Sequence, residues 1–327
     1  MIQFPTGDFL DERKSREFFD ASLSPRQENR AMSEPQGNLL TAGRRLHLHH
    51  GPIDLIVESF GVAAEVLVSY QQARERFRTV LAELVCELPL LRTQVTQLPK
   101  APQGAMAQCM VAAVRNHDGF VTPMAAVAGA VAEEILEALT AGRNLRRAYV
   151  NNGGDIAFML EAGACFQVGV VNNAALPGLN AQVELHHDDP VRGLATSGWR
   201  GRSFSCGIAD AVTVLARTAA EADVAATLIA GAVNTDHPGI IRKPACELTD
   251  DSDLGARLVT VSVPKLPCEA VSAALARGAE YAQRLWKSGR IEAAYLALQG
   301  ATRIFPNPQT QQTHDGPDSD SQNHHHA

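Results

Sequence analysis

The stretch Val150-Asn151-Asn152-Gly153-Gly154-Asp155-Ile156 decides the fold class expected for this chain. Apolar residues on both sides predict strands, and the two glycines allow the positive φ values of a tight turn. Exposed amides in such a turn can bind phosphate or ring carbonyl oxygens. We therefore interpret residues 151–155 as a candidate ligand-binding turn. An ordinary hairpin turn, in which Asn, Gly and Asp are common, is the alternative.

A second segment places a carboxylate and a hydroxyl one helical turn apart. Thr218 and Glu221 have the spacing of a capping box, which predicts a helix from residue 218. Asp223 and Thr227 then share an alanine-rich face, where a lone carboxylate would be costly to desolvate. A bound Mg²⁺ would resolve this conflict, because it accepts carboxylate and hydroxyl oxygens. A solvated face, with alanine chosen for helix propensity, is the alternative.

Two further segments have small or anion-binding residues. Residues 196–203 contain Thr196, Ser197, Arg200 and Arg202, and arginine can bind phosphate through two nitrogens. A solvated surface loop explains the same composition. Residues 125–132 are small, so a flat ligand or another backbone can approach closely; dense helix packing is the alternative.

The remaining pattern mixes helices and strands without strict alternation. This order predicts an α+β fold, a mixed sheet flanked by helices, rather than a doubly wound parallel sheet. Helices are expected over residues 62–87, over 122–142 with Thr122 as the cap, from 218, and over 269–287. Strands are expected over residues 45–57 with a break at 51–52, 149–150, 157–160, 166–171, 212–216 and 257–263, with a final extended segment over 291–304.

Composition divides the chain into three parts. Residues 1–42 are polar and predict a flexible extension, residues 43–305 form the α+β domain, and residues 306–327 predict a disordered tail. The tail carries His324-His325-His326, which can bind metal weakly.

Charge and hydropathy exclude some partners. The net charge of −7 argues against nucleic-acid binding, and the longest apolar runs are too short for a membrane span. The start lacks the pattern of a signal peptide, so we expect a cytoplasmic protein. Six scattered cysteines without a Cys-x-x-Cys pair predict buried thiols. His186 to Asp189 is interpreted as a polar turn rather than a metal site.

The combined segments resemble the ApbE superfamily, whose characterised members are FAD:protein FMN transferases. Residues 126–132 are similar to the family's small-residue helix, residues 151–156 to its flavin-binding turn, and residues 196–198 to its threonine–serine–glycine segment. Residues 210–215 with 222–227 are similar to its strand and metal-binding helix. The resemblance covers roughly residues 117–235.

The resemblance implies a site, cofactors and a reaction. Asp223 and Thr227, with the carbonyl of Ala128, would bind Mg²⁺. FAD or FMN would be bound by Asn152, Gly153, Gly154, Asp155, Thr196 and Ser197. The implied reaction transfers FMN from FAD to a threonine of an acceptor protein and releases AMP.

Two departures from the family pattern leave alternatives open. Gly129 stands where the transferases have a lysine, and residues 201–205 replace a histidine-containing stretch. A non-catalytic flavin or nucleotide carrier, or an enzyme for another small metabolite in the same pocket, therefore remains an alternative. A homodimer through the helix over residues 62–87 also remains open, and no catalytic residue is assigned.

Overall fold

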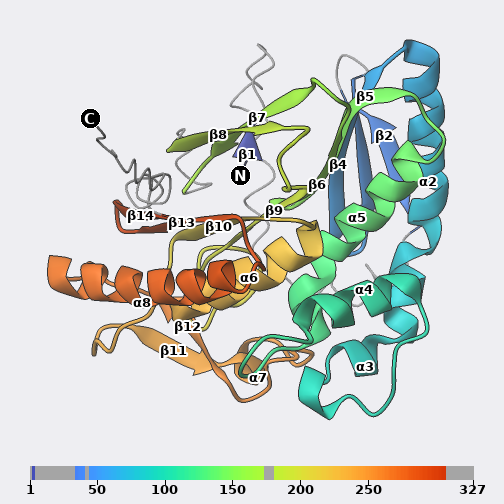
Figure 1. Cartoon of the computed structure of the whole chain (residues 1–327). Helices are drawn as coiled ribbons and strands as arrows, with labels where there is room; N and C mark the ends of the chain where they lie inside the picture. The colour runs from blue at the N-terminus through green and yellow to red at the C-terminus, as the bar shows by residue number, and fades with distance from the viewer. Residues whose placement is uncertain (1, 4–33, 41–43, 173–179, 307–327) are drawn as a thin grey trace, which may run out of the picture.

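The protein is built around one large antiparallel sheet (Figure 1). The structure, a computed structural model, describes residues 2–3, 34–40, 44–172 and 180–306. All neighbouring strands of the nine-stranded sheet run antiparallel, which gives the expected α+β fold but not a mixed sheet. In spatial order its strands are β14 (Ala301–Phe305), β13 (Ala293–Leu298), β10 (Ala211–Ala216), β9 (Gly193–Ser197), β6 (Asp155–Leu160), β5 (Leu145–Asn152), β4 (Ile53–Gly61), β3 (Arg45–His50) and β2 (Gln36–Leu39).

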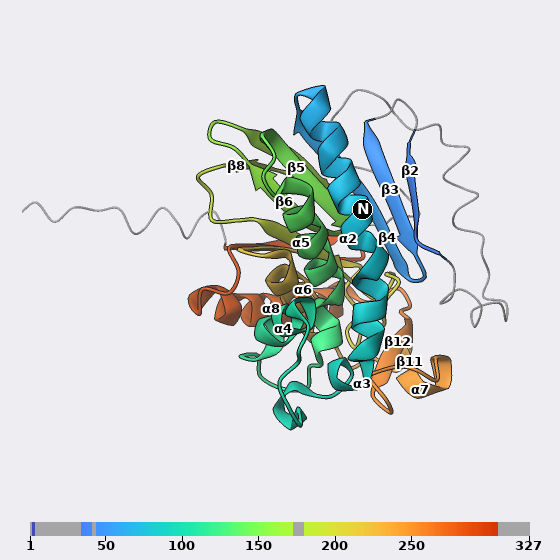
Figure 2. The same cartoon turned by 90° about the vertical axis from the view of Figure 1, so that its right-hand side faces the viewer.

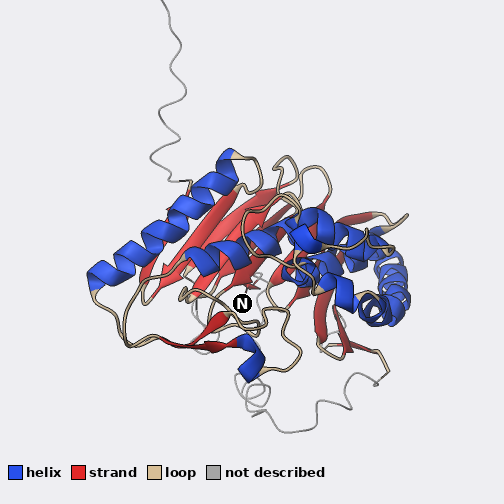
Figure 3. Cartoon of the chain, turned by 90° about the horizontal axis from the view of Figure 1, so that it is seen from below, coloured by secondary structure: helices blue, strands red, loops and turns tan. Residues whose placement is uncertain are grey.

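Four long helices pack against this sheet. They are α2 (Ala63–Cys86), α5 (Val127–Thr140), α6 (Ala219–Ala232) and α8 (Cys268–Lys287). They follow the strand order: α2 contacts β3 and β4, α5 contacts β5 and β6, α6 contacts β6, β9 and β10, and α8 contacts β13 and β14. Figure 2 shows α2 and α5 side by side in front of the strands, and Figure 3 shows the helices beside the strand layer from below.

A smaller sheet packs on the strands from the other side. It consists of β1 (Ile2–Gln3), β7 (Cys165–Val170) and β8 (Ala181–His186) in the order β1-β7-β8. Tyr149 and Phe158 of the large sheet share an apolar cluster with Phe166 and Leu185 of the small one. Alternate residues of β5 and β6, such as Val150 and Ala157, belong instead to the cluster under the helices. The strands are thus buried on both faces.

The remaining elements are short. They are α3 (Leu88–Leu91), α4 (Ala105–Val114), α7 (Ala245–Leu248), the 3₁₀ helices Val95–Gln97 and Pro123–Ala126, and the paired strands β11 (Ile241–Pro244) and β12 (Leu258–Ser262).

Two expected helix starts have different outcomes. The hydroxyl of Thr218 accepts a hydrogen bond from the Glu221 amide at 3.2 Å, so the predicted cap of α6 is confirmed. Thr122 does not cap its helix, because its hydroxyl donates to the carboxylate of Asp253. A 3₁₀ turn follows Thr122, and α5 begins only at Val127.

The segment expected as one extended piece, residues 291–304, is a hairpin. β13 and β14 are joined at Gln299 and Gly300, whose φ values are 47° and 84°. Gln299 is held there because its amide N–H donates to Asp210 and its side chain contacts Leu266 and Pro264. A left-handed glutamine is uncommon, so only Gly300 gives a turn signal in the sequence, and a single glycine does not predict a hairpin.

Small residues bring α6 very close to its neighbours. A Cβ placed on Gly129 of α5 would lie 2.2 Å from the carbonyl oxygen of Ala219, and one on Gly193 of β9 would lie 2.1 Å from the Ala219 nitrogen. Dense packing, the alternative for residues 125–132, is therefore confirmed. These approaches hold the first turn of α6 against the first turn of α5.

The terminal regions are described only in part. Within the predicted extension 1–42, Ile2–Gln3 forms β1 and Gln36–Leu39 forms the edge strand β2. The other residues of the predicted extension, 1, 4–33 and 41–42, lie outside the described residues. The predicted tail also lies outside them from residue 307. Within the described ranges, none of the helices combines the length and apolar content needed to span a bilayer.

Candidate functional site

Asp155, the first residue of β6, is a half-buried carboxylate. Its Oδ1 accepts a hydrogen bond from the amide of Thr196 on β9 at 3.3 Å. Burial raises the pKa of Asp155 to about 7, against the opposing effects of the Thr196 N–H and the positive charge of Arg202. Asp155 is therefore partly protonated near neutral pH.

Asp223, on α6, is a second half-buried carboxylate in the same place. Its Oδ2 accepts hydrogen bonds from the amides of Ala128 at 3.1 Å and Gly129 at 3.0 Å, in the first turn of α5. The positive end of that helix favours a carboxylate. Burial nevertheless raises the pKa of Asp223 well above its ordinary value, and the charge of Asp155 raises it further.

Ala128 contacts Asp223 and Asn152 through its two backbone groups. Its N–H donates to Asp223, and its carbonyl oxygen accepts a hydrogen bond from the Asn152 amide nitrogen at 3.1 Å. Asn152, at the end of β5, thereby fixes the position of α5 over the glycine turn. As the second residue of α5, Ala128 also has its carbonyl in the helical ladder, so both lone pairs of this oxygen are engaged.

The double-glycine turn is an ordinary two-residue hairpin loop. Asn152 pairs with Asp155, and Gly153 and Gly154 have φ values of 68° and 120°. The Gly154 amide donates to the Asn151 side chain at 2.9 Å, so it is already used within the turn. The guanidinium of Arg202 lies over Gly153, where an added Cβ would be 2.3 Å from its Nη2. The glycines of the turn therefore make room for the Arg202 guanidinium, and they do not offer free amides to a ligand.

The other predicted residues lie around the pair with different partners. The hydroxyl of Thr196 contacts that of Thr213 at 2.9 Å, and Ser197, the last residue of β9, is half-buried. Thr227 is half-buried one turn beyond Asp223 on α6. Among the hydrogen bonds of the described residues, none joins the Thr227 hydroxyl to Asp223 or Asp155.

The structure decides between the alternatives for the helix face. The alanines around Asp223 are fully buried, so the solvated-face interpretation of α6 is wrong. For the loop after Ser197, the solvated interpretation is correct over residues 200–204, which are exposed. The contact of Arg202 with Gly153 could not be predicted, because nothing in the sequence spacing relates the two residues.

Paired carboxylates in a half-buried place can bind a proton or a divalent cation. Asp155 and Asp223 repel each other, and each has an oxygen used by backbone amides. A hard cation fits these two carboxylates, because carboxylate oxygens are among the ligands that Mg²⁺ accepts. Asp155 was predicted as a ligand-binding residue, but its position opposite Asp223 carried no signal in the sequence.

Two surface cavities lie elsewhere. One, of about 570 Å³, includes Arg146, Arg147 and Cys165 in its lining, and another, of about 580 Å³, includes Lys265 and Arg303. Neither is lined by Asp155 or Asp223. We base the site on the carboxylate pair because the chemistry, rather than the volume, distinguishes it.

One known protein family matches most of this chain. A family model described as "AbpE bacteria" matches residues 37–304, from β2 through β14. The chain belongs to this family. The match covers the described helices and strands except β1, the first residue of β2 and the last residue of β14.

The chain is also similar to archaeal proteins named UPF0280. It is 36% identical over 167 residues to the UPF0280 protein of Methanothrix thermoacetophila, covering 49% of this chain and 66% of that protein. It is 38% identical over 133 residues to the protein of Methanopyrus kandleri, covering 40% of this chain and 51% of that one. The chain thus spans about half to two thirds of the length of these curated relatives.

These matches correct the resemblance inferred from the sequence. The family found is AbpE bacteria and the relatives are UPF0280 proteins, so the assignment to the ApbE superfamily of FAD:protein FMN transferases is wrong. The segments behind it are short and serve the fold. Gly129 allows the close crossing of α5 and α6, and Gly153 and Gly154 form a hairpin loop.

Proposed function

We propose that this protein binds a divalent cation, Mg²⁺, between Asp155 and Asp223, and through it a phosphate-bearing nucleotide. The observation that carries the proposal is the pair of half-buried carboxylates beside the start of α5, in which the charge of Asp155 raises the pKa of Asp223. A cation bound there would neutralise both carboxylates and the ligand's phosphates. Arg202 over Gly153 supports an anionic ligand on the same side.

A flavin nucleotide is the ligand we propose, with FAD as the probe. FAD has a pyrophosphate that would be bound by the cation and by Arg202, whose guanidinium lies over Gly153. Cleavage of FAD with transfer of FMN to a protein threonine is the proposed reaction if the protein is an enzyme. In that case positioning and charge stabilisation would be the main contributions of this chain's residues.

A non-catalytic nucleotide carrier is the second candidate. The contacts of the described histidines support it, because they lie away from the carboxylate pair: His47 contacts Asp54, His186 contacts Glu184, and His187 contacts Leu160. None of the hydrogen bonds and ion pairs of the described histidines involves Asp155 or Asp223. We also propose the cytoplasm as the compartment, because all six cysteines are free thiols, as is usual in a reducing environment. These thiols are exposed or half-buried, so the prediction of buried thiols is wrong.

Calorimetry with FAD, with and without Mg²⁺, tests the proposal. We expect FAD binding that requires Mg²⁺ and that is lost in Asp155→Asn and Asp223→Asn, which keep the size of each side chain. Asp250→Asn removes an exposed carboxylate after α7 and should bind as the wild type does. Chromatography for AMP then separates the two candidates: AMP release indicates transfer or cleavage, and binding without AMP indicates a carrier. Mg²⁺-independent binding, or no binding, would refute the proposal.

A further inference from the structure

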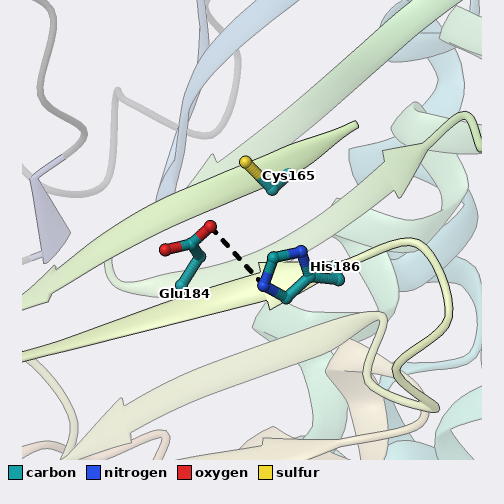
Figure 4. A group of neighbouring side chains, drawn as sticks. All are labelled: Cys165, Glu184 and His186. Carbon is teal, nitrogen blue, oxygen red and sulfur yellow. Dashed lines mark ion pairs between the residues drawn. The ribbon is translucent and has the colours of Figure 1, made fainter. Parts of the chain in front are cut away.

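The outer face of the small sheet holds three side chains that the carboxylate site does not use. Cys165 on β7 is paired directly with His186 on β8, and Glu184 lies two residues before His186. Alternate residues of a strand point to the same face, so all three side chains lie together. Figure 4 shows them over two neighbouring strands, with the ion pair between Glu184 and His186.

The distances between these side chains suit a transition metal. The Cys165 Sγ, a Glu184 oxygen and a His186 ring nitrogen all lie within 4.8 Å of one another, and the His186 Nε2 is 3.5 Å from the Glu184 Oε1. A tetrahedral zinc site, with bonds of about 2.0–2.3 Å, requires ligand atoms roughly 3.3–3.8 Å apart. Small rotations of the half-buried thiol and the two exposed side chains bring all three into this range.

The backbone around these side chains is already fixed. The Cys165 carbonyl accepts a hydrogen bond from the Arg147 Nη1 at 2.8 Å, and the guanidinium of Arg147 lies over Phe166. The His186 amide donates to the Asp189 Oδ2 at 2.7 Å. A metal would therefore order only side chains, while the strand register stays as it is.

We propose that Cys165, Glu184 and His186 bind a zinc ion, with one coordination position left open to solvent. A thiolate, a carboxylate and a neutral imidazole carry two negative charges, which Zn²⁺ balances. The thiolate selects zinc over Mg²⁺ or Ca²⁺, which take oxygen ligands. Three protein ligands and an open position are the arrangement of a zinc ion that can bind water or a small anion. The interpretation of residues 186–189 as a polar turn is correct for the loop, but it missed that His186 itself lies on β8.

Zinc titration of the full chain tests this proposal. Because His324, His325 and His326 can bind zinc on their own, the titration is done in a background with all three changed to alanine. We expect one zinc ion per chain in this background. Cys165→Ser and His186→Ala should each weaken binding on the order of 100-fold, and Glu184→Gln should weaken it less.

Cobalt substitution and two controls make the test specific. Co²⁺ should show thiolate charge-transfer absorption that disappears in Cys165→Ser and persists in Cys246→Ser, which removes an exposed thiol elsewhere. Asp155→Asn should leave zinc binding unchanged, which separates this site from the proposed magnesium site. Two results would overturn the proposal: no zinc binding when the three tail histidines are alanine, or unchanged zinc affinity in Cys165→Ser and His186→Ala. The three side chains would then be an exposed ion pair beside a free thiol.

Discussion

At the scale of the residue, Asp155 and Asp223 determine how the protein responds to pH. Both carboxyl groups bind protons more tightly in the folded chain than in the unfolded one. The folded state therefore holds protons that the unfolded state has lost, and its stability depends on pH with a predictable sign.

We expect Asp155 to make the free energy of unfolding fall as pH rises from about 4 to about 7. Its pKa is about 7 in the folded state and 3.8 in the reference state, so the folded form loses its extra proton in this window. His117 acts in the opposite direction, because burial lowers its pKa from 6.5 to about 4. The measurement is therefore the difference between wild-type and Asp155→Asn urea denaturation across pH, in which His117 cancels. A difference that does not change between pH 4 and 7 would contradict the shift.

Gly153 and Gly163 form a matched pair for testing the role of Arg202. Both have positive φ, 68° and 77°, so alanine at either should destabilise the fold by about 1–2 kcal/mol. Only at Gly153 would the new methyl group displace the Arg202 guanidinium; at Gly163 it meets nothing within 4 Å. We expect both variants to lose similar stability in urea, and only Gly153→Ala to weaken FAD binding. Equal FAD affinity in the two variants would remove Arg202 from the site.

At the scale of the element, the crossing of α5 and α6 depends on glycine. At Gly129 the obstacle to a side chain is the backbone of Ala219, which cannot rotate away as a flexible side chain can. Space at such a crossing is therefore fixed by the helix axes and not by rotamers.

Gly129→Ala should destabilise the protein by about 3 kcal/mol, the upper range for overpacking a core. Gly231, in the last turns of α6, is the control, because a Cβ there meets nothing within 4 Å. Gly231→Ala should leave stability unchanged or increase it by up to about 1 kcal/mol through helix propensity. Thermal and urea denaturation measure both. Similar stabilities for the two alanine variants would mean that the helices can separate without cost.

Sequence patterns predicted elements well where one local rule was sufficient. The apolar periodicity located α2 and α8 to within a residue or two, and the capping box located the start of α6. They failed where a distant partner decided the outcome: Asp253 draws Thr122 away from the cap, and Asp210 holds the turn at Gln299. The candidate site follows the same rule. Asp155 and Asp223 were each predicted as site residues, but their proximity depends on the packing of α5 and α6.

At the scale of the whole molecule, one sheet joins two apolar clusters. The first lies under α2, α4 and α5, and the second under α6 and α8, and both include residues of α6. The strands continue from one cluster to the other without a break in pairing. Neither cluster is thus a separate unit.

We therefore expect a single cooperative unfolding transition. Trp199 and Trp286, the two tryptophans of the chain, lie in its second half, at the end of β9 and on α8. Helix content reported by circular dichroism includes α2 and α5 of the first half. Tryptophan fluorescence and circular dichroism should give the same midpoint in urea. Separated midpoints would show that the two clusters unfold independently.

The central position of α6 has a consequence for the time scale on which Asp223 can move. The backbone amides of α6 are covered by α5, α8 and the strands. They should therefore exchange with deuterium only when the whole chain unfolds. An arriving ion would then meet a carboxylate already oriented, and little ordering entropy would oppose its capture.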